Sequence, residues 1–352
     1  MEELFKKGIS FIQTINHKDK ILLIYHKDLD GLTSALIFLK YAKRNGIKIL
    51  KRVPSSNEEI DEIIKKIKSF DKILIFDIDI SYMKKKLVKV NKEMLIIDHH
   101  PPRANLNTKK IVYINPRLLN PKIYQPTSYI TYKLVSKISN VKDEEWLAVL
   151  GTISDYGIED CEDLIRNWTK IKKKEEIQKT KIWKQVEELI GIISEFGFSK
   201  TLNLLEKVKS FDDFKKKKVV KKALKDYKKK KKIYEKIFWK NIRKFKSSNL
   251  LISEMETKHR EITSLISTKM SIKFPENVIV IFRKSGEKYA VNVRYNGSKE
   301  IDLGKIMEKC AKGLNGGGGH QSAAGATIKA KNKEIFEKRL IEEVKKFFKV
   351  NP

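Results

Sequence analysis

The sequence predicts an α/β protein in which a mostly parallel, doubly wound sheet domain is followed by a lysine-rich helical linker and a second, smaller α/β domain. Three observations lead to this prediction. Short apolar runs alternate with helical patterns over residues 1–158, lysine-rich helical patterns fill residues 159–272, and strand signals return in residues 273–352. Repeated alternation of strand and helix is typical of a parallel sheet covered by helices on both faces.

Five strands are expected in the first domain, and the first of them, residues 21–25, is a short apolar run typical of a buried strand. They cover residues 21–25, 47–53, 73–76, 94–97 and 111–114. Apolar residues at helical spacing lie between and after these runs. The expected helices cover residues 32–44, 58–68, 81–90, 127–138 and 143–150, and Gly46 stands where the first of them should be capped.

The central segment has few strand signals. Between Phe214 and Phe245, apolar residues recur at helix-like intervals and lysine fills most of the gaps. This pattern predicts one or more long basic helices. Such a stripe, with Tyr, Phe and Trp239 interleaved, could hold a phosphate backbone, or it could be the solvated face of a linker helix.

The last segment returns to strand signals. Residues 278–282 and 289–294 predict a hairpin across Ser285-Gly286. Helices are expected over residues 303–310 and 333–348, with a glycine-rich stretch between them. A length of 352 residues suits this division into two or three domains.

The composition favours an anionic partner. Lys and Arg number 76 against 44 Asp and Glu, which leaves a formal charge of +32. This excess points to nucleic acid, a nucleotide or a membrane surface. A bias like that of proteins from hot environments would account for part of the lysine, but it should raise Glu equally.

The cysteine content and the apolar patterning suggest a compartment. Two cysteines, Cys161 and Cys310, are too few for a disulfide framework or a zinc cluster and fit a reducing environment. The first residues are acidic and lack the apolar stretch of a signal peptide. No run approaches the roughly 18 apolar residues of a membrane span. We therefore expect a soluble, cytoplasmic protein that does not act at a membrane.

Metal-ligand residue types gather at four places. They are His26, Asp28 and Asp30; Asp77 and Asp79; Asp98, His99 and His100; and Asp155. The first three groups directly follow apolar strands, and the carboxyl ends of parallel strands meet at one edge of a sheet. So many carboxylates at one edge would repel each other strongly unless cations lay among them.

The donor set indicates two metal ions. Aspartates mixed with histidines suit Mn²⁺ and similar ions, and at least six ligands suggest a pair. Such a pair can hold a phosphoryl oxygen and acidify a water for in-line attack on phosphorus. Each group also has a structural interpretation, since an Asp after a strand often caps a turn. We favour that interpretation for Asp79 alone, but four coinciding groups favour metal binding.

These motifs resemble the DHH phosphoesterase family, named for its Asp-His-His triplet. His26-Lys27-Asp28-Leu29-Asp30-Gly31 is similar to the first motif in its RecJ-like form, and Asp98-His99-His100 to the third. Asp77 and Asp155 fall where the second and fourth motifs have their aspartates. The stretch from Gly316 to Gly325 resembles the signature of the DHH-associated domain.

The resemblance implies a role for each of these residues. Two Mn²⁺ ions, with Mg²⁺ or Co²⁺ as alternatives, would be held by Asp28, Asp30, Asp77, His99 and Asp155, with His26 as a further ligand or as a partner of one. His100 would contact the substrate phosphate and Asp98 would orient the histidines. The substrate phosphate would be bound by Arg294, Gly317, Gly318, Gly319 and His320. Consecutive glycines allow backbone N–H groups to approach an anion closely, although they also suit a flexible turn.

The function that the resemblance implies is an archaeal-type RecJ-like exonuclease. It would hydrolyse single-stranded DNA or RNA by a two-metal mechanism, in a site between the two domains. One alternative is a phosphodiesterase of short oligonucleotides, cyclic or linear dinucleotides, or bisphosphonucleotides. Another is a scaffold role in a replication or repair complex, with the lysine-rich helices as a docking surface. The choice of DNA or RNA and the direction of digestion stay open.

Overall fold

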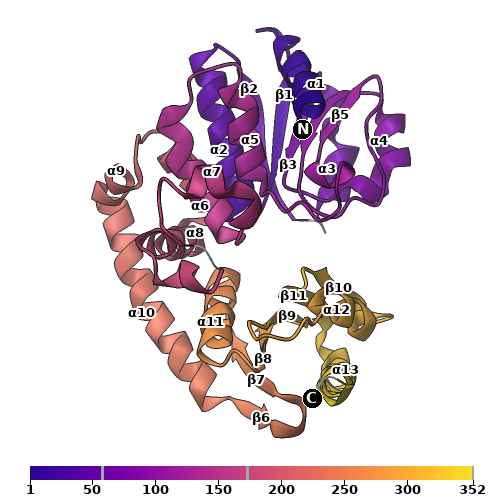
Figure 1. Cartoon of the computed structure of the whole chain (residues 1–352), viewed down its shortest axis with the longest axis vertical. Helices are drawn as coiled ribbons and strands as arrows, with labels where there is room; N and C mark the ends of the chain where they lie inside the picture. Colours follow the sequence, from indigo (N-terminus) through magenta and orange to yellow (C-terminus); the bar gives the residue numbers. More distant parts are fainter. Residues whose placement is uncertain (57–58, 172–173, 351–352) are drawn as a thin grey trace. The chain divides into compact units, whose positions relative to one another are not determined.

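The computed structural model describes residues 1–56, 59–171 and 174–350. The chain divides into two compact units, Met1–Lys221 and Lys222–Pro352 (Figure 1). Each unit is built around its own sheet. The predicted fold class, a parallel sheet domain followed by a smaller α/β domain, is confirmed.

The first unit contains a five-stranded parallel sheet in the order β2-β1-β3-β4-β5. The strands are β1 (Ile21–His26), β2 (Ile49–Ser55), β3 (Lys72–Phe76), β4 (Glu93–Ile97) and β5 (Ile111–Ile114). All residues of β3 are buried, as are the last four of β4, because helices cover both faces of the sheet. This explains why the central strands β1, β3 and β4 are largely apolar in the sequence, whereas the edge strand β2 contains Lys51 and Arg52 and is mostly exposed or half-buried.

Two layers of helices enclose this sheet (Figure 1). α1 (Glu2–Gln13), α2 (Leu29–Arg44) and α5 (Thr127–Ser136) contact strands from one side. α3 (Ile60–Lys65) and α4 (Lys84–Val90) bury their apolar residues against the other. The remaining helices of this unit are α6 (Glu145–Ser154), α7 (Glu162–Ile165), α8 (Lys181–Leu205) and α9 (Phe211–Lys216). α6 packs on α2 and α5, so these three helices form one bundle beside the sheet.

Several elements differ from the expectation. α1 was not predicted, although Leu4, Phe5, Phe11 and Ile12 recur at helical spacing and are buried. The helix expected from Ser81 is a short 3₁₀ turn followed by α4. The helix expected over residues 58–68 is divided into α3 and a 3₁₀ turn, and its first residue lies outside the described ranges.

The second unit contains a mixed six-stranded sheet in the order β10-β11-β9-β8-β7-β6. The strands are β6 (Arg243–Phe245), β7 (Leu250–Glu256), β8 (Val278–Ser285), β9 (Lys288–Arg294), β10 (Asn315–Gly319) and β11 (Ala323–Lys329). Only β7 and β8 are paired in parallel. The predicted hairpin is β8 and β9, and Gly286 in its turn has a φ of +59°.

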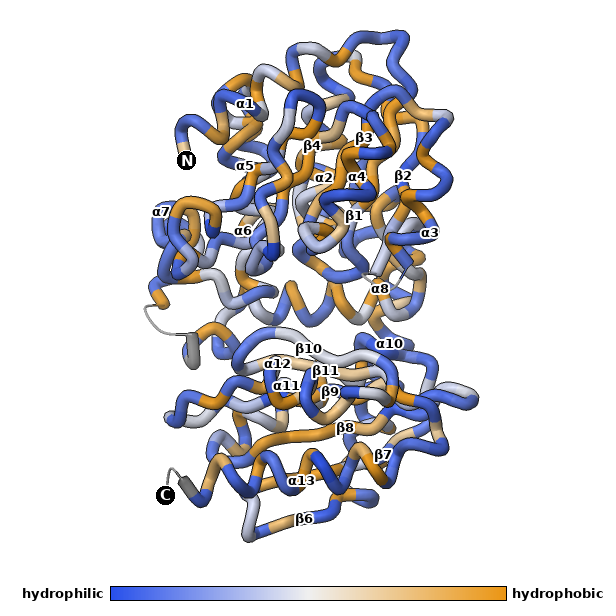
Figure 2. The backbone as a smooth tube through the Cα atoms, turned by 90° about the vertical axis from the view of Figure 1, so that its right-hand side faces the viewer, coloured by the Kyte–Doolittle hydropathy of each residue, from blue (hydrophilic) through white to orange (hydrophobic). Residues whose placement is uncertain are grey.

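α10 (Lys218–Lys240) begins in the last four residues of the first unit and continues into the second. The other helices of the second unit are α11 (Arg260–Lys273), α12 (Leu303–Ala311) and α13 (Lys333–Val350). α12 and α13 pack on one face of the sheet, where Val280, Met307 and Leu340 belong to one buried cluster. α11 lies on the other face, where Asn292 donates from Nδ2 to Oγ1 of Thr263 at 2.9 Å. Figure 2 shows the apolar character of β8, which is central in this sheet.

The expected three-part division into residues 1–158, 159–272 and 273–352 stays a prediction. β7 and α11 lie in the segment expected to be a linker, residues 159–272, yet β7 pairs with β8 along its whole length. The apolar run at the start of β7, Leu250 to Ile252, is only three residues long. It follows a lysine-rich segment with helical spacing, so the sequence analysis did not identify it as a strand. Across the described ranges, no helix combines the length and the apolar character that crossing a membrane requires.

Candidate metal centre

The first metal-ligand group is positioned by the junction between β1 and α2. Asp28 is the N-cap residue of α2, and its side chain accepts a hydrogen bond from the backbone N–H of Gly31 at 2.8 Å. His26, the last residue of β1, contacts the same carboxylate through Nδ1. A Cβ atom at position 31 would lie 2.6 Å from the carbonyl oxygen of His26. Glycine is therefore required for this tight turn.

Asp30 is held from the opposite side by the start of α5. Its carboxylate is fully buried and accepts hydrogen bonds from the backbone N–H groups of Thr127 at 2.7 Å and Ser128 at 2.9 Å. These groups are the first donors of a helix, which have no partner inside the helix and favour an anion. The hydroxyl of Thr127 donates to Oδ1 of Asp77 at 3.1 Å. α5 thus fixes two carboxylates of the site.

Asp77 lies at the centre of the arrangement. It follows β3 directly, and its φ of +64° places it in the left-handed region, which is uncommon for a residue other than glycine. Its N–H donates to the carbonyl of Ile97 at 2.8 Å, which holds this conformation. Its Oδ2 is buried without a hydrogen-bond partner among the described residues. Strained backbone of this kind is typical of functional sites.

His99 and Asp155 complete the arrangement. Nε2 of His99 is 3.3 Å from Oδ1 of Asp77 and 3.5 Å from Oδ2 of Asp155. Asp155 is the C-cap residue of α6, and its backbone carbonyl accepts a hydrogen bond from the Tyr124 hydroxyl at 3.0 Å. The ring of Tyr124 also lies 5.3 Å from that of His99. The sequence analysis did not identify Tyr124, because a single tyrosine in a loop carries no recognisable signal.

Seven of the predicted residues therefore meet at the carboxyl edge of the first sheet. Their ligand atoms form three groups, each with all atoms within 4.8 Å: His26, Asp28 and Asp77; Asp77, His99 and His100; and Asp30, His99 and Asp155. Asp77 and His99 each belong to two groups. Shared ligands of this kind are what two neighbouring ion positions require.

The electrostatics of the cluster fit cations. Burial and the charge of Asp28 raise the pKa of Asp30 to about 6. Burial and neighbouring carboxylates raise the pKa values of Asp77 and Asp155 well above their ordinary range. Burial also acts on Asp28, but the charge and hydrogen bond of His26 outweigh it and lower that pKa. Together with the unpartnered oxygen of Asp77, this crowding of carboxylates favours positive ions among them.

His100 is oriented by a buried carboxylate. Its Nδ1 lies 2.7 Å from Oδ1 of Asp98, which is fully buried, and its backbone carbonyl accepts a hydrogen bond from Asn115 at 2.9 Å. Burial disfavours the charged ring, but the charge and hydrogen bond of Asp98 raise the pKa of His100 to about 9. The ring is therefore fixed in direction, and Asp98 favours its charged form.

Asp79, the second acid after β3, makes different contacts. Its Oδ1 accepts hydrogen bonds from the backbone N–H of Ser81 at 3.0 Å and from the Ser81 hydroxyl at 2.6 Å. It belongs to none of the three groups. Its geometry is that of a turn residue, which leaves Asp77 as the acid that joins the cluster.

The predicted substrate-binding residues lie together in the second unit. Arg294 ends β9 and pairs in register with Ala323, and Gly319 ends β10 opposite Ala324, so they share one end of the sheet. Arg294 donates from Nη2 to Oγ of Ser264 at 3.2 Å. The N–H of His320 donates to the carbonyl of Ala323 at 2.9 Å.

The glycines between Asn315 and Gly319 form an edge strand instead of a loop. A Cβ atom on Gly317 would lie 2.7 Å from the carbonyl of Met307, so this glycine allows α12 to pack closely on β10. Gly318 has no such constraint. The expected placement of the site between the two domains stays a prediction.

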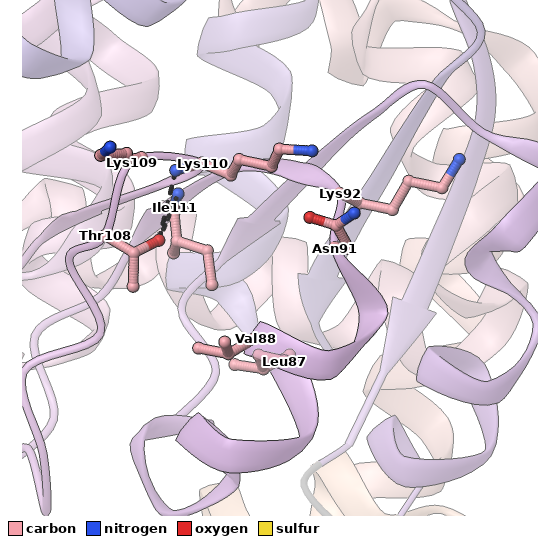
Figure 3. A pocket seen from close by; sticks show the side chains of 8 residues that line it. All are labelled: Leu87, Val88, Asn91, Lys92, Thr108, Lys109, Lys110 and Ile111. Atoms are coloured by element: carbon pink, nitrogen blue, oxygen red, sulfur yellow. Dashed lines mark hydrogen bonds between the residues drawn. The ribbon is translucent and has the colours of Figure 1, made fainter.

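A separate pocket lies at the opposite edge of the first sheet. It has a volume of about 340 Å³ and is found where β4 and β5 begin (Figure 3). Its lining residues are Leu87, Val88, Asn91, Lys92, Thr108, Lys109, Lys110 and Ile111. It contains none of the predicted site residues.

Comparison with known protein families identifies both units. The DHH family, N-terminal domain, matches residues 20–153, and the DHHA1 domain matches residues 247–349. The two domains occur in the predicted order and together account for more than half of the chain. The chain therefore belongs to the DHH family, as its motifs predicted.

Individual relatives are distant. An uncharacterised protein of Methanocaldococcus jannaschii is 30% identical over 147 residues, which are 40% of this chain and 34% of the relative. The alignment thus spans about a third of the length of the curated relative. RecJ from Thermus thermophilus, solved with Mn²⁺, has a TM-score of 0.70 at 15% identity over 98% of this chain and 55% of that one. A pGpG-specific phosphodiesterase from Vibrio cholerae has a TM-score of 0.54 at 14% identity, and the match covers 93% of this chain and 99% of that one. These two structures share the fold.

Proposed function

We propose that this protein is a metal-dependent phosphodiesterase that removes nucleotides from single-stranded DNA or RNA. The observation that carries the proposal is the convergence of His26, Asp28, Asp30, Asp77, His99, His100 and Asp155 at one sheet edge. Membership of the DHH family and the fold shared with RecJ support it. The formal charge of +32 supports a polyanionic substrate.

Two ion positions would share Asp77. His26 and Asp28 would hold one ion with it, and Asp30, His99 and Asp155 the other. Mn²⁺ is the ion that the donor set favours, with Mg²⁺ or Co²⁺ as alternatives. When bound, the pair supplies an activated water and neutralises the negative charge that develops on the phosphoryl oxygens.

The protein's own groups would position the phosphate. His100, kept charged by Asp98, would contact a non-bridging oxygen and could donate a proton toward the leaving oxygen. Arg294 presents a planar fork that fits two phosphate oxygens, and the end of β10 next to His320 would hold the same group. Asp30, Asp77 and Asp98 are fully buried, so water would screen their interactions with a bound ion or with His100 only weakly.

A second candidate is a phosphodiesterase of small substrates, such as short oligonucleotides, dinucleotides or bisphosphonucleotides. The observation that favours it is the fold shared with the pGpG-specific phosphodiesterase, which this chain covers over 99% of its length. A third candidate is a scaffold role in a replication or repair complex. It would apply if the protein has no hydrolytic activity.

A gel time course with Mn²⁺ tests these proposals. End-labelled single strands of DNA and RNA and a linear dinucleotide are incubated with the wild-type protein and with the Asp77→Asn variant. We expect stepwise shortening of a long strand by the wild type alone. Cleavage confined to the dinucleotide would assign the small-substrate function. No cleavage of any substrate at saturating Mn²⁺ would exclude both enzymatic proposals and leave the scaffold.

A further inference from the structure

Helix α10 presents two chemically different faces. One face is apolar and packed, and Val220, Leu224, Tyr227 and Phe238 are all at most 7% exposed. The backbone carbonyl of Phe238 accepts a hydrogen bond from the hydroxyl of Ser253 in β7 at 3.2 Å. The apolar face therefore fixes the helix on the protein and leaves the opposite face to solvent.

The exposed face carries lysine almost without interruption. We define the lysine stripe as eight exposed lysines of α10: Lys218, Lys221, Lys222, Lys225, Lys229, Lys232, Lys236 and Lys240. At about 100° per residue they fall within a sector roughly 120° wide, along a helix about 35 Å long. The two acids of α10, Asp226 and Glu235, lie outside this sector. Glu235 instead pairs with Lys269 of α11 at 2.8 Å.

This arrangement is unfavourable without an anionic partner. Lysines three or four residues apart on a helix face lie side by side and repel each other. A solvated surface helix would normally mix acids with its lysines, which removes that repulsion. The stripe has only one sign of charge along its whole length, so an extended anion is the ligand that it complements.

An aromatic side chain lies at the end of the stripe. Trp239 is 39% exposed, and its ring stands edge-on to Phe274 with the ring centroids 5.7 Å apart. Nζ of Lys273 lies 4.8 Å from the centroid of the same indole. An exposed indole beside several ammonium groups is suited to stack on a nucleobase whose phosphate the lysines hold.

We propose that the lysine stripe and Trp239 form a binding surface for the backbone of single-stranded nucleic acid. It is distinct from the metal centre in the first unit and from Arg294 and His320 at the end of the second sheet. The surface contacts phosphates and a base face, so it binds without regard to sequence. The proposal rests on the proposed function only in that a polynucleotide is the expected substrate.

The test measures the binding of a fluorescent 20-nucleotide single strand to the full-length protein in EDTA, as anisotropy over a range of salt concentrations. The stripe variant carries Lys222→Gln, Lys225→Gln, Lys229→Gln and Lys232→Gln. The control variant carries the same charge change at four exposed lysines elsewhere, as Lys6→Gln, Lys18→Gln, Lys85→Gln and Lys89→Gln. Glutamine has a helix propensity close to that of lysine, and circular dichroism verifies that α10 is retained.

We expect the stripe variant to bind at least tenfold more weakly than the control. The slope of log affinity against log salt should decrease by up to roughly 3, because each contacted phosphate of a single strand contributes about 0.7. Equal affinity and equal slope in the two variants would overturn the proposal. The proposal would also be overturned if the stripe variant still bound the single strand but no longer bound a polyglutamate peptide. That result would indicate an acidic protein as the partner of the stripe.

Hydrolysis of a dinucleotide in Mn²⁺ separates this proposal from the proposed function. The stripe variant should cleave the dinucleotide at the wild-type rate, because its metal ligands are unchanged. If the wild type cleaves nothing while the stripe variant has lost strand binding, the proposed function fails and the binding surface stands. If cleavage is intact and both variants bind the strand equally, the surface fails and the enzyme stands.

Discussion

Asp77 joins three features that are seldom found on one residue. It is buried, it is held at a φ of +64°, and its carboxylate lies within reach of His26 and His99. Asn tolerates the left-handed region as well as Asp does, so replacing Asp77 by Asn keeps the shape of the turn and removes only the charge. This makes the position a clean test of the metal centre.

The first prediction compares Asp77→Asn with Asp79→Asn. We expect Asp77→Asn to lower kcat by at least about 10³-fold, or roughly 4 kcal/mol in the barrier, because a shared metal ligand is lost. Asp79→Asn should stay within a few-fold of wild type, since an amide oxygen can still accept from Ser81. Steady-state kinetics on a dinucleotide with Mn²⁺ measures both. An equal decrease in kcat in the two variants would contradict the assignment of Asp77 as a metal ligand.

A second prediction concerns stability without metal. The pKa of Asp30 is raised from 3.8 to about 6 in the folded state, so folding favours its neutral form. The stability contributed by that neutral carboxyl is present at low pH and is lost as pH rises from about 4 through 6. In EDTA, the Tm should therefore decrease between pH 5 and pH 8, and Asp30→Asn should reduce the decrease.

Added Mn²⁺ should reverse this trend. An ion that binds only the folded state stabilises it by RT ln(1 + [L]/Kd), about 2.7 kcal/mol at a hundredfold excess over Kd. The increase in Tm on adding Mn²⁺ should be larger at pH 8 than at pH 5, where protons compete for the carboxylates. A thermal shift series at the two pH values measures this, and an equal increase at both would argue against metal binding by this cluster.

The convergence of the candidate metal-ligand residues could be predicted from sequence because their types are few and most of them directly follow strands. What could not be predicted was the role of backbone and neutral groups. The N–H groups of Thr127 and Ser128 bind Asp30, and Tyr124 contacts the carbonyl of Asp155. Nearly every residue has a backbone N–H, so the sequence does not show which of these donors bind Asp30. The contacts can be identified only once α5 is placed against α2.

At the scale of elements, the junction of α2, α5 and α6 controls the site. Each helix contributes one part of it: Asp30 from α2, the amide donors from α5 and Asp155 after α6. The three helices approach closely at Gly151, where a Cβ atom would lie 2.2 Å from Oγ1 of Thr33 and 2.4 Å from Oγ of Ser128. The spacing of these helices therefore sets the spacing of the ligands.

The third prediction follows from this contact. Gly151→Ala should destabilise the protein by about 1–3 kcal/mol, the usual cost of overpacking, and weaken Mn²⁺ binding by moving α6. Gly316→Ala is the matched control, because a Cβ atom there meets nothing within 4 Å. Urea unfolding and Mn²⁺ titration measure both effects. An unchanged midpoint in Gly151→Ala would contradict the view that this junction is tightly packed.

The elements that could be predicted were those whose sequence pattern fits only one type of secondary structure. The strands β1, β3 and β4 are continuous apolar runs because both faces of the parallel sheet are covered. β10 was not predicted as a strand, since glycine has low β-propensity, yet this segment pairs with β11 and packs closely on α12. β7 was missed because tertiary pairing with β8, which its short apolar run does not reveal, decides its conformation.

At the scale of the whole molecule, the two units divide the proposed chemistry between them. The three groups of candidate ligand atoms found among the described residues lie in the first unit, while Arg294 and the end of β10 lie in the second. Metal binding and phosphate binding should therefore respond separately to substitution.

The fourth prediction uses this separation. Arg294→Gln should raise KM for a dinucleotide by about 10- to 100-fold, since a hydrogen bond to a charged group contributes roughly 1.5–3 kcal/mol. The affinity for Mn²⁺ and the Tm increase that Mn²⁺ produces should not change. Kinetics and calorimetric Mn²⁺ titration provide the two readouts. Weakened Mn²⁺ binding in this variant would show that the two functions are not separate.

The order of the metal ligands along the chain has a consequence for how the protein is made. Asp155 is the last of them, and the first unit ends at Lys221. A ribosome adds roughly 5–20 residues per second, so all the candidate ligand residues are synthesised on the order of ten seconds before the last strand of the second sheet. During that interval the first unit can fold around its carboxylate cluster. Under the proposed function, the first unit would therefore take up its ions before Arg294 and the end of β10 have folded.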